Sequence, residues 1–441
     1  MKKLLSMILA GVVIVSSFTG CSSKVKPSTS SPQPADGSDS PVTLEYWTWF
    51  PSSDQFKETI ANFEKENPNI KINLTVMESK NFQEKVPLAL ASEENIDIIG
   101  VQPTAFATEI SDYLSDLDPL LKKEAGDDWA AVYSESCIEK SKNLTGGNLK
   151  FLAMVNSGSM IGYYNADLLK ELNMQVPATI EEYKKVAEAL KAKYPDKYAG
   201  VFGGKESWIM DEMMLTVLGQ QGDYYNKWRY EKASVDSPEF ITAFKGFKQF
   251  FDEDIFTQDL LDLDGGRAAE IFAAGDALVW YMGSWEAPIL SSKLREQKGI
   301  KLGDVGAMAL PVVKQGGNAA VRSYLDAGIG IVNYSEKQEA AAKFVAYCTV
   351  GKGVDTLAKQ FMGTPGKKDF AMDETMLTSE NAKAGWNKLI ELMNTATADR
   401  NNVSGYSDIE GASVQKVVGN TSTAEEEVKA LQTEWTSGKY Q

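Results

Sequence analysis

Short β-rich segments alternate with amphipathic helical patterns from Val42 onward, and this alternation limits the possible folds more than any other feature of the chain. Residues 42–47 alternate as a strand, and apolar residues at helical spacing follow between Phe56 and Phe63. Residues 70–74 then alternate as a second strand. A strand, a helix and a strand in this order form a β-α-β unit, which predicts a mainly parallel sheet covered by helices.

The same alternation continues beyond the first unit. Residues 82–101 have an apolar helical pattern followed by a β-rich run. Two further helices are predicted at capping boxes, in which two side chains three residues apart satisfy the first amide groups of a helix: Thr179 with Glu182, and Ser335 with Gln338. The chain has 441 residues, which is longer than one ordinary domain, and 43% of them are apolar, which is enough for a large core. We therefore expect two lobes.

The composition excludes several classes of chemistry. The chain has no histidine, which removes Ser-His-Asp and Cys-His nucleophiles and histidine-bound zinc, so any catalysis would depend on carboxylates. A formal charge of −16 argues against nucleic acid as a partner, because nucleic-acid binding needs basic side chains. The cysteines lack a Cys-x-x-Cys spacing; Cys137 and Cys348 are expected to be buried thiols, with a disulfide as the alternative in an exported protein.

Residues 1–20 have the order of an export signal, with two lysines, a short apolar run and then small residues. The residues before Cys21 resemble the lipobox of bacterial lipoproteins, which implies that Cys21 receives a lipid and becomes the first residue of the mature chain. Ordinary cleavage near the same point is the alternative. Residues 21–41 are rich in Ser and Pro and poor in apolar residues, so we expect a lipid-anchored tether rather than a folded segment.

Five stretches of the remaining chain carry a family resemblance: residues 44–47 with 63–68, residues 97–99, residues 163–169 with 177–179, residues 272–277 with 282–285, and more weakly residues 309–311 with the strand from Ala327. In this order and spacing they resemble the extracellular solute-binding proteins of bacterial ABC importers. The closest likeness is to the carbohydrate-binding group that includes maltose-binding protein. The resemblance extends over nearly the whole mature chain.

The resemblance implies an α/β fold of the two-lobed, periplasmic-binding-protein type (type II), with a ligand cleft between lobes that hinge strands join. It implies these lobes: residues 42–155 with 328–370 as lobe one, and residues 156–327 with 371–441 as lobe two. The hinge crossings would fall near these residues: Asn156, Ala327 and Pro365.

The resemblance also implies a function. The protein would capture a carbohydrate by hinge closure and deliver it to the permease subunits of an ABC transporter, without covalent chemistry, cofactor or metal. Nine Trp and seventeen Tyr favour an oligosaccharide over a single sugar. We expect a monomer that is not an enzyme, held at the cell membrane by the lipid on Cys21 and facing the outside of a Gram-positive cell or the periplasm.

A sugar has an apolar face and a rim of hydroxyl groups, so its site needs aromatic platforms and planar polar side chains. Trp47 and Trp49 lie at the carboxyl end of the first strand, where ligands bind in open α/β sheets. We expect them to point to opposite faces, so that one is a platform and the other belongs to the core. Trp285, with Gly283 before it, stands where the resembling family places a stacking aromatic in the second lobe; a core tryptophan is the alternative.

Polar candidates come from the ends of other predicted elements. Gln102 follows the β-rich run that ends near residue 101, where a plain turn residue is equally expected. Asn156 and Ser157 lie at the first crossing, where they could reach ligand hydroxyl groups or satisfy a kinked backbone.

The second lobe supplies the remaining candidates. Trp208 and Asp211 place an aromatic beside a carboxylate at a helix start, where Asp211 could instead be a cap. Tyr324 and Asp326 precede the second crossing and would overhang the cleft, and Arg322 could pair with Asp326.

Other functions remain open from the residues alone. A lipoprotein glycoside hydrolase would use two carboxylates, although no pair stands out in the sequence. A surface adhesin would have no small ligand and no cleft closure. Within the same fold, a polyol phosphate or a quaternary amine could replace the sugar. Iron held by the adjacent Tyr224 and Tyr225 is weakly supported, because no histidine or neighbouring carboxylate completes a ligand set.

Overall fold

The computed structural model describes residues 41–368, 370–396, 403 and 405–440, and the structural statements below concern these residues. The expected export signal, Cys21 and the tether up to residue 40 lie outside them. Among the described residues, no helix combines the length and the apolar character that crossing a bilayer requires.

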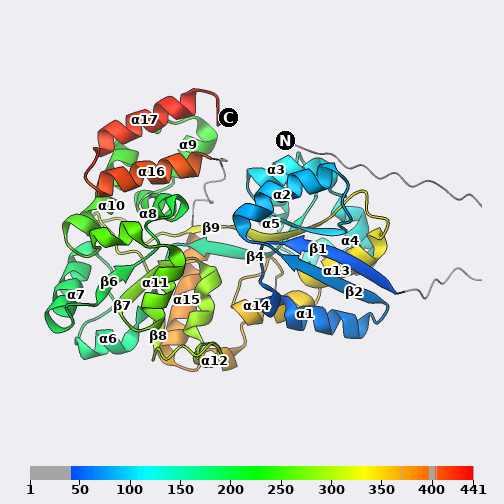
Figure 1. The fold of residues 1–441 in the computed structure, drawn as a ribbon, viewed down its shortest axis with the longest axis horizontal. Coiled ribbons are helices and arrows are strands. Elements are labelled where there is room, and N and C mark those ends of the chain that lie inside the picture. The colour runs from blue at the N-terminus through cyan, green and yellow to red at the C-terminus, as the bar shows by residue number, and fades with distance from the viewer. Residues whose placement is uncertain (1–40, 369, 397–402, 404, 441) are drawn as a thin grey trace, which may run out of the picture. The chain divides into compact units, whose positions relative to one another are not determined.

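The first sheet has five strands in the order β2-β1-β3-β9-β4. The bounds of these strands are β1 Val42–Thr48, β2 Ile70–Val76, β3 Ile98–Val101, β4 Leu152–Ser159 and β9 Arg322–Ile331. Strands β2, β1 and β3 are parallel, as the β-α-β pattern predicts, whereas β9 is antiparallel to both β3 and β4. The later chain therefore enters this sheet between its early strands (Figure 1).

The helices that belong with the first sheet come from both ends of the described chain. They are α1 Ser53–Glu66, α2 Ser79–Ala91, α3 Ala105–Ile110, α4 Leu117–Ala125, α5 Glu135–Leu144, α13 Gln338–Thr349 and α14 Gly353–Phe361, with short 3-10 turns η1 Ser111–Tyr113 and η2 Trp129–Val132. Buried side chains between Leu44 and Val155, and between Leu325 and Leu357, form one continuous core under this sheet. We call this sheet, its helices and its core the first lobe.

The second sheet has four strands in the order β6-β7-β5-β8. Their bounds are β5 Ile161–Asn165, β6 Tyr198–Val201, β7 Ala277–Met282 and β8 Val305–Ala309. Only β6 and β7 are parallel; β5 is antiparallel to both of its neighbours. The prediction of a mainly parallel sheet concerns the first lobe, where it holds for β2, β1 and β3 and not for β9 and β4.

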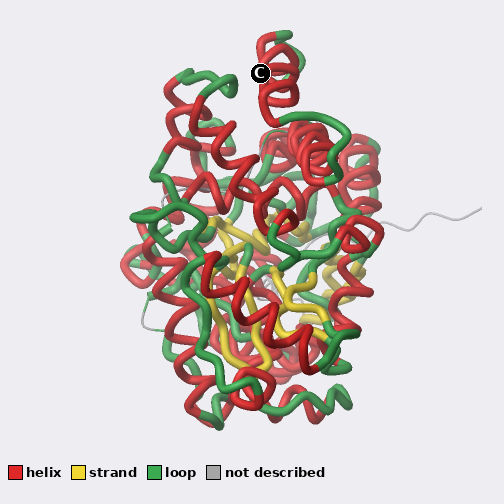
Figure 2. Tube along the Cα trace, turned by 90° about the vertical axis from the view of Figure 1, so that its left-hand side faces the viewer, coloured by secondary structure: helices red, strands yellow, loops and turns green. Residues whose placement is uncertain are grey.

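The second sheet is surrounded by helices, as the strands at the centre of Figure 2 show. They are α6 Ala166–Glu171, α7 Ile180–Lys193, α8 Ser207–Gly219, α9 Tyr224–Glu231, α10 Pro238–Asp252, α11 Gly265–Ala273, α12 Ser292–Gln297, α15 Glu380–Thr395, α16 Tyr406–Val418 and α17 Ala424–Thr436, with 3-10 turns η3 Gln258–Asp262, η4 Ser284–Leu290 and η5 Glu374–Met376. Their buried side chains form a second core, drawn from residues between Met160 and Val321 and between Met362 and Leu431. This sheet, its helices and its core are the second lobe.

Two antiparallel strands lead from one lobe to the other. Strand β4 ends at Ser159, and β5 of the second sheet begins at Ile161. Strand β9 runs beside β4, with Ser159 opposite Arg322. Ala327, where the second crossing is predicted, lies inside β9, which is ten residues long.

Helix starts test the predicted capping residues. Thr179 and Glu182 form the predicted capping box at α7. The box predicted at Ser335 is wrong, because α13 begins after Lys337 and the Ser335 hydroxyl group instead donates to Asp97. The Ser335 oxygen accepts from the Lys337 amide at 3.1 Å, two residues on, instead of from the Gln338 amide that a capping box requires.

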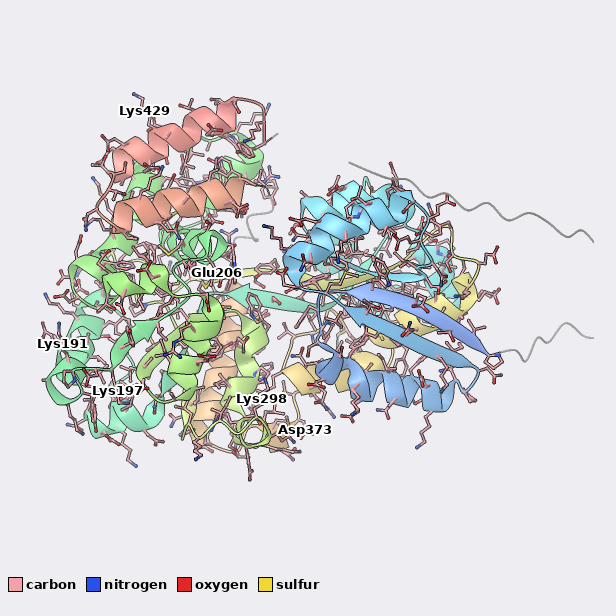
Figure 3. The ribbon with its side chains drawn as sticks, viewed as in Figure 1. Lys191, Lys197, Glu206, Lys298, Asp373 and Lys429 are labelled. Atoms are coloured by element: carbon pink, nitrogen blue, oxygen red, sulfur yellow. The ribbon has the colours of Figure 1, made fainter. Side chains whose placement is uncertain are left out.

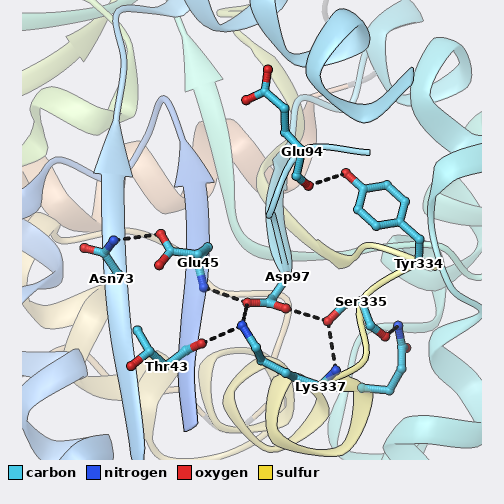
Figure 4. A network of polar contacts seen from close by, with 9 residues as sticks. Thr43, Glu45, Asn73, Glu94, Asp97, Tyr334, Ser335 and Lys337 are labelled. Atoms are coloured by element: carbon cyan, nitrogen blue, oxygen red, sulfur yellow. Dashed lines mark hydrogen bonds and ion pairs between the residues drawn. The ribbon is translucent and has the colours of Figure 1, made fainter. Parts of the chain in front are cut away.

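Asp97 is the centre of a polar network that joins β1 to the segment before α13 (Figure 4). Its carboxylate accepts hydrogen bonds from the Glu45 amide at 2.8 Å, the Ser335 hydroxyl at 2.6 Å and the Lys337 ammonium at 2.9 Å. The Lys337 ammonium also donates to the Thr43 carbonyl at 2.8 Å. The Asp97 side chain is 4% exposed, so these donors replace water almost completely.

Replacing Asp97 with asparagine is expected to lower the free energy of unfolding by about 2 kcal/mol, because the amide cannot accept from all three donors and the lysine loses its counterion. Urea unfolding of the Asp97→Asn variant measures this loss. Asp127→Asn, at an exposed aspartate, is the matched control and should change stability by less than about 0.5 kcal/mol. Equal effects of the two substitutions would show that the network contributes nothing.

Candidate ligand-binding cavity

A cavity of about 950 Å³ is lined by residues of both lobes. The first lobe contributes the loop after β1, the start of α2, the end of β3 and α3, and the second contributes α8, η4 and the start of α16. Another cavity, of about 910 Å³ beside β8, is lined by the second lobe only and contains no tryptophan. The cavity between the lobes is therefore the one whose walls could move relative to each other on ligand binding.

Aromatic side chains face this cavity from both lobes. Trp49 and Phe50 follow the end of β1, and Trp49 packs on Phe82 with ring centroids 5.4 Å apart. In the second lobe, the rings of Trp208 and Trp285 lie 6.2 Å apart with their planes inclined at 43°. The Trp208 indole N–H donates to Glu206 at 2.7 Å, which fixes that ring; Figure 3 labels Glu206 in the second lobe.

Trp49 lines the cavity and Trp47 does not. Both are partly buried against the core of the first lobe. The prediction that Trp47 and Trp49 point to opposite faces of a strand is wrong, because residues two apart in a strand share a face. The two residues differ because β1 ends at Thr48, so Trp49 lies on the loop at the carboxyl end of the sheet.

Gly283 does not line the cavity, contrary to its prediction as a binding residue, but it determines where Trp285 lies. A Cβ atom on Gly283 would come within 2.2 Å of two ring carbons of Trp285. The indole ring therefore lies directly on the glycine backbone. The Gly283 carbonyl in turn accepts a hydrogen bond from the buried Tyr163 hydroxyl at 2.9 Å, which holds this backbone in place.

Replacing Gly283 with alanine should weaken ligand binding about tenfold, because the new methyl group displaces the Trp285 ring from its stacking position. Isothermal titration calorimetry measures the change, with the ligand that raises the melting temperature most in the thermal-unfolding experiment described below. Gly266→Ala is the control. A Cβ atom there would lie 3.3 Å from its nearest neighbour, a side-chain oxygen, and Gly266 does not line the cavity. Unchanged affinity in Gly283→Ala would contradict a fixed platform at Trp285.

Gln102 lines the cavity as predicted from its position after β3. Its side-chain amide donates to the Ser79 hydroxyl at 3.0 Å and its carbonyl accepts from the Gln83 amide. Ser79 and Gln83 also line the cavity, so the three residues form a polar patch on the first lobe. Each amide group can make further hydrogen bonds to a ligand hydroxyl group.

Asp326 lines the cavity from β9 and is 9% exposed. One carboxylate oxygen accepts from the Ser157 hydroxyl at 2.7 Å, and the other accepts from the Ala327 amide at 2.8 Å. Ser157 is thus a buried support for Asp326 and does not line the cavity itself. These contacts orient the Asp326 carboxylate at the cavity wall.

Two other predicted residues lie away from the cavity lining. The Asn156 backbone forms an isolated bridge with Thr364, and its side-chain carbonyl faces the Cys137 thiol at 3.6 Å. Its side chain therefore contacts the first-lobe core, and the backbone rather than the side chain bonds at the crossing. Tyr324 is buried on β9. Cys137 and Cys348 are both free, buried thiols.

A buried charged cluster lies behind the second-lobe wall of the cavity. Arg322 is 1% exposed, and its guanidinium lies 3.1 Å from the Glu212 carboxylate and 4.2 Å from the centre of the Tyr225 ring. Glu212 also accepts from the Ser159 hydroxyl at 2.5 Å. The ion pair of Arg322 with Glu212 joins β9 to α8, which the sequence did not predict.

Two further carboxyl groups complete this cluster. Asp211 lines the cavity and is hydrogen-bonded to the buried Glu410 of α16. Two carboxyl groups can share a hydrogen bond only when one carries a proton. Burial raises the pKa of Asp211 well above its ordinary value, and the charges of Glu410 and Glu212 add to the effect. Asp211 is therefore not a helix cap, since Glu206 precedes the first residue of α8.

Burial also raises the pKa of Glu410 from 4.5 to about 7, although Asp211 and Arg322 oppose the shift. Between these two pKa values, Glu410 holds its proton in the native state more tightly than in the unfolded chain. Its contribution to the free energy of unfolding is therefore full below the unfolded pKa and is lost as pH rises through the native pKa. We expect Glu410→Gln to reduce the stability lost between about pH 5 and about pH 8 by roughly 1–3 kcal/mol. Urea unfolding at both pH values tests this, and an unchanged difference in the variant would contradict it.

Several lining residues were missed by the sequence reasoning. Glu78, Lys80 and Glu84 follow β2, and Phe106 and Glu109 lie on α3 after β3. The strand-end rule that selected Trp49 and Gln102 applies equally to these positions. In contrast, nothing in the local pattern placed Ser407 and Asp408 of the α16 start at the same cavity.

Metal binding finds no support in the described residues. They contain no group of three or more cysteine, aspartate and glutamate side chains arranged to hold an ion. The Tyr224 hydroxyl donates to the Ser234 carbonyl at 3.0 Å, and the Tyr225 ring packs against Arg322. The adjacent tyrosines are therefore structural in this arrangement.

Comparison with known proteins agrees with this geometry. The multiple sugar-binding protein of Streptococcus mutans serotype c is 25% identical over 330 residues, which cover 71% of this chain and 72% of the relative. The galactooligosaccharide-binding protein of Bacillus subtilis is 20% identical over 393 residues, 87% of this chain and 85% of the relative. A maltose-bound structure from T. maritima has a TM-score of 0.73 at 17% identity, covering 90% of this chain and 99% of that one.

The structural match confirms the expected α/β binding-protein fold. A family model described as bacterial extracellular solute-binding protein matches residues 49–354, which is more than half of the chain. This family binds solutes and is not catalytic, so the hydrolase alternative is not supported. The chain belongs to the bacterial extracellular solute-binding proteins.

Proposed function

We propose that this protein captures an oligosaccharide in the cavity between its lobes and delivers it to the permease of an ABC importer. The observation that carries the proposal is the set of aromatic rings that face one cavity from both lobes, with Trp49 on one side and Trp208 and Trp285 on the other. The sugar-binding names of the relatives from S. mutans and B. subtilis support the same ligand class.

The lining chemistry suits a sugar. Aromatic faces stack on the C–H groups of a pyranose ring. Side-chain amide groups donate to and accept from neighbouring sugar hydroxyl groups, and carboxylates accept from them. Gln102 and Asp326 supply such groups from the first lobe and from β9. A cavity of about 950 Å³ lies within the range that small-molecule sites occupy.

Transport would depend on closure of the lobes. A ligand that touches both lobes binds the closed form better, and this differential affinity shifts the population toward closure. The lobes in this proposal are residues 42–155 with 328–370 and residues 156–327 with 371–441. Residues 156–159 of β4 and 322–327 of β9 pair within the first-lobe sheet and form the connection between the lobes. The closed form is what the membrane permease recognises.

We also propose that the mature chain is a monomer anchored through a lipid on Cys21, on the outer side of a Gram-positive membrane or in the periplasm. The order of residues 1–41 supports this part. Mass spectrometry of the membrane fraction tests it, since Cys21→Ala should abolish the lipid adduct and release the protein.

The binding proposal is tested with the purified mature chain carrying Cys21→Ala. Thermal unfolding is measured with maltotriose, raffinose, galactotriose, single sugars, betaine and glycerol phosphate. A saturable rise in melting temperature with an oligosaccharide that chromatography recovers intact is expected, because selective binding to the native state stabilises it. A shift only with betaine or glycerol phosphate would contradict the carbohydrate assignment.

A further inference from the structure

The cavity walls have an unusual charge. Among the described lining residues, seven carry carboxyl groups, and Lys80 is the one lysine or arginine. The charge of this lining affects which ligands can bind, because a bound sugar loses its contacts with water and gains contacts with these side chains.

The basic group nearest the inner wall is already committed to protein carboxylates. Arg322 lies behind the wall, fully buried, and pairs with Glu212 at 3.1 Å. Asp211 and Glu410 share a hydrogen bond beside it, so one of the two carries a proton, and the Glu212 carboxylate is paired with the guanidinium. The inner wall therefore offers an anionic ligand no uncommitted positive charge.

The outer wall of the cavity, formed by α2, α3 and the start of α16, is acidic. Glu78 caps α2 by accepting from the Lys80 and Asn81 amides, and the Lys80 ammonium lies 4.0 Å from the Glu84 carboxylate. Glu109 of the first lobe and Asp408 of the second are both exposed, so carboxylates face the cavity from each lobe. These exposed carboxylates therefore give the lining a negative charge on both lobes.

We propose that this cavity admits oligosaccharides that are neutral or carry a basic amino group and rejects those that carry a carboxylate, sulfate or phosphate. This inference rests on the proposed function and narrows its ligand class. An acidic sugar would lose its hydration next to like charges, a juxtaposition that costs several kcal/mol at interfaces. Neutral hydroxyl groups donate to the same carboxylates, and an ammonium group gains from them.

The test compares matched probes by isothermal titration calorimetry with the mature chain carrying Cys21→Ala. Maltotriose, raffinose and galactotriose are each compared with the form whose terminal C6 alcohol is oxidised to a carboxylate and with the form in which it is an amine. We expect the carboxylate form of the bound sugar to bind at least about tenfold more weakly and the amine form at least as tightly as the alcohol. A carboxylate form that binds within about threefold of the alcohol would overturn the inference.

A variant separates the local charge from the charge of the whole protein. The triple variant Glu84→Gln, Glu109→Gln and Asp408→Asn should narrow the alcohol-to-carboxylate affinity ratio at least about threefold. The control triple Asp127→Asn, Glu296→Gln and Glu380→Gln changes net charge equally at exposed positions outside the lining and should leave the ratio unchanged. Equal narrowing in both triples would overturn the role of the lining.

Failure of this inference is distinguishable from failure of the proposed function. If no neutral, acidic or basic sugar bound, the carbohydrate assignment itself would fail and this inference with it. If sugars bound with no preference by charge, only the inference would fail.

Discussion

Replacing Arg322 with methionine is expected to lower the free energy of unfolding by about 3–5 kcal/mol. The variant leaves Glu212 buried without its cation, next to the Asp211–Glu410 pair. It also removes the guanidinium from the Tyr225 ring, where it lies 4.2 Å from the centroid. Urea unfolding followed by circular dichroism measures the loss.

Two comparisons make this prediction specific. Arg267→Met removes an exposed arginine. The side chains of Arg267 and its partner Glu270 are 59% and 70% exposed, so the substitution should lower the free energy of unfolding by less than about 0.5 kcal/mol. The double variant Arg322→Met with Glu212→Gln removes both charges and should recover part of the loss, because the uncompensated buried charge is gone. A single Arg322→Met variant as stable as the wild type would show that the cluster is not charged as described.

Replacing Trp285 with alanine is expected to weaken sugar binding at least about thirtyfold, because stacking area at the centre of a site dominates its affinity. The ring lies on the Gly283 backbone and beside Trp208, so no neighbouring aromatic can take its place without moving. Calorimetry with the tightest-binding oligosaccharide measures the effect.

Trp47→Ala is the matched control for this experiment. Trp47 is also partly buried and close to the end of β1, yet it does not line the cavity. Its removal should leave affinity within about twofold of the wild type, although stability decreases. The reverse order, with Trp47→Ala losing affinity and Trp285→Ala keeping it, would place the ligand elsewhere.

Local patterns predicted those parts of the fold that local interactions determine. The β-α-β opening and the capping box at Thr179 depend on neighbouring residues, and both are present. The strand-end rule selected Trp49 and Gln102 for the same reason, since each directly follows a strand. Ser335 shows the limit, because its hydroxyl group donates to the distant Asp97 and accepts from the Lys337 amide, so it does not form the box with Gln338 that the pattern predicts.

The remaining features depend on contacts between distant segments. Arg322 was expected beside Asp326 because the two are close in sequence, whereas its partner Glu212 lies on α8. The role of Gly283 required the position of the Trp285 ring, which no spacing rule gives. The acidic lining combines residues from α2, α3, α8, β9 and α16, so its charge became visible only once the lobes were folded.

A crystal structure with the tightest-binding oligosaccharide tests the central claim most directly. The account predicts sugar rings stacked on Trp285, with further contacts to Trp49 or Gln102 of the first lobe, so that one ligand touches both lobes. A sugar bound in the cavity beside β8, or held by one lobe alone, would contradict capture between the lobes.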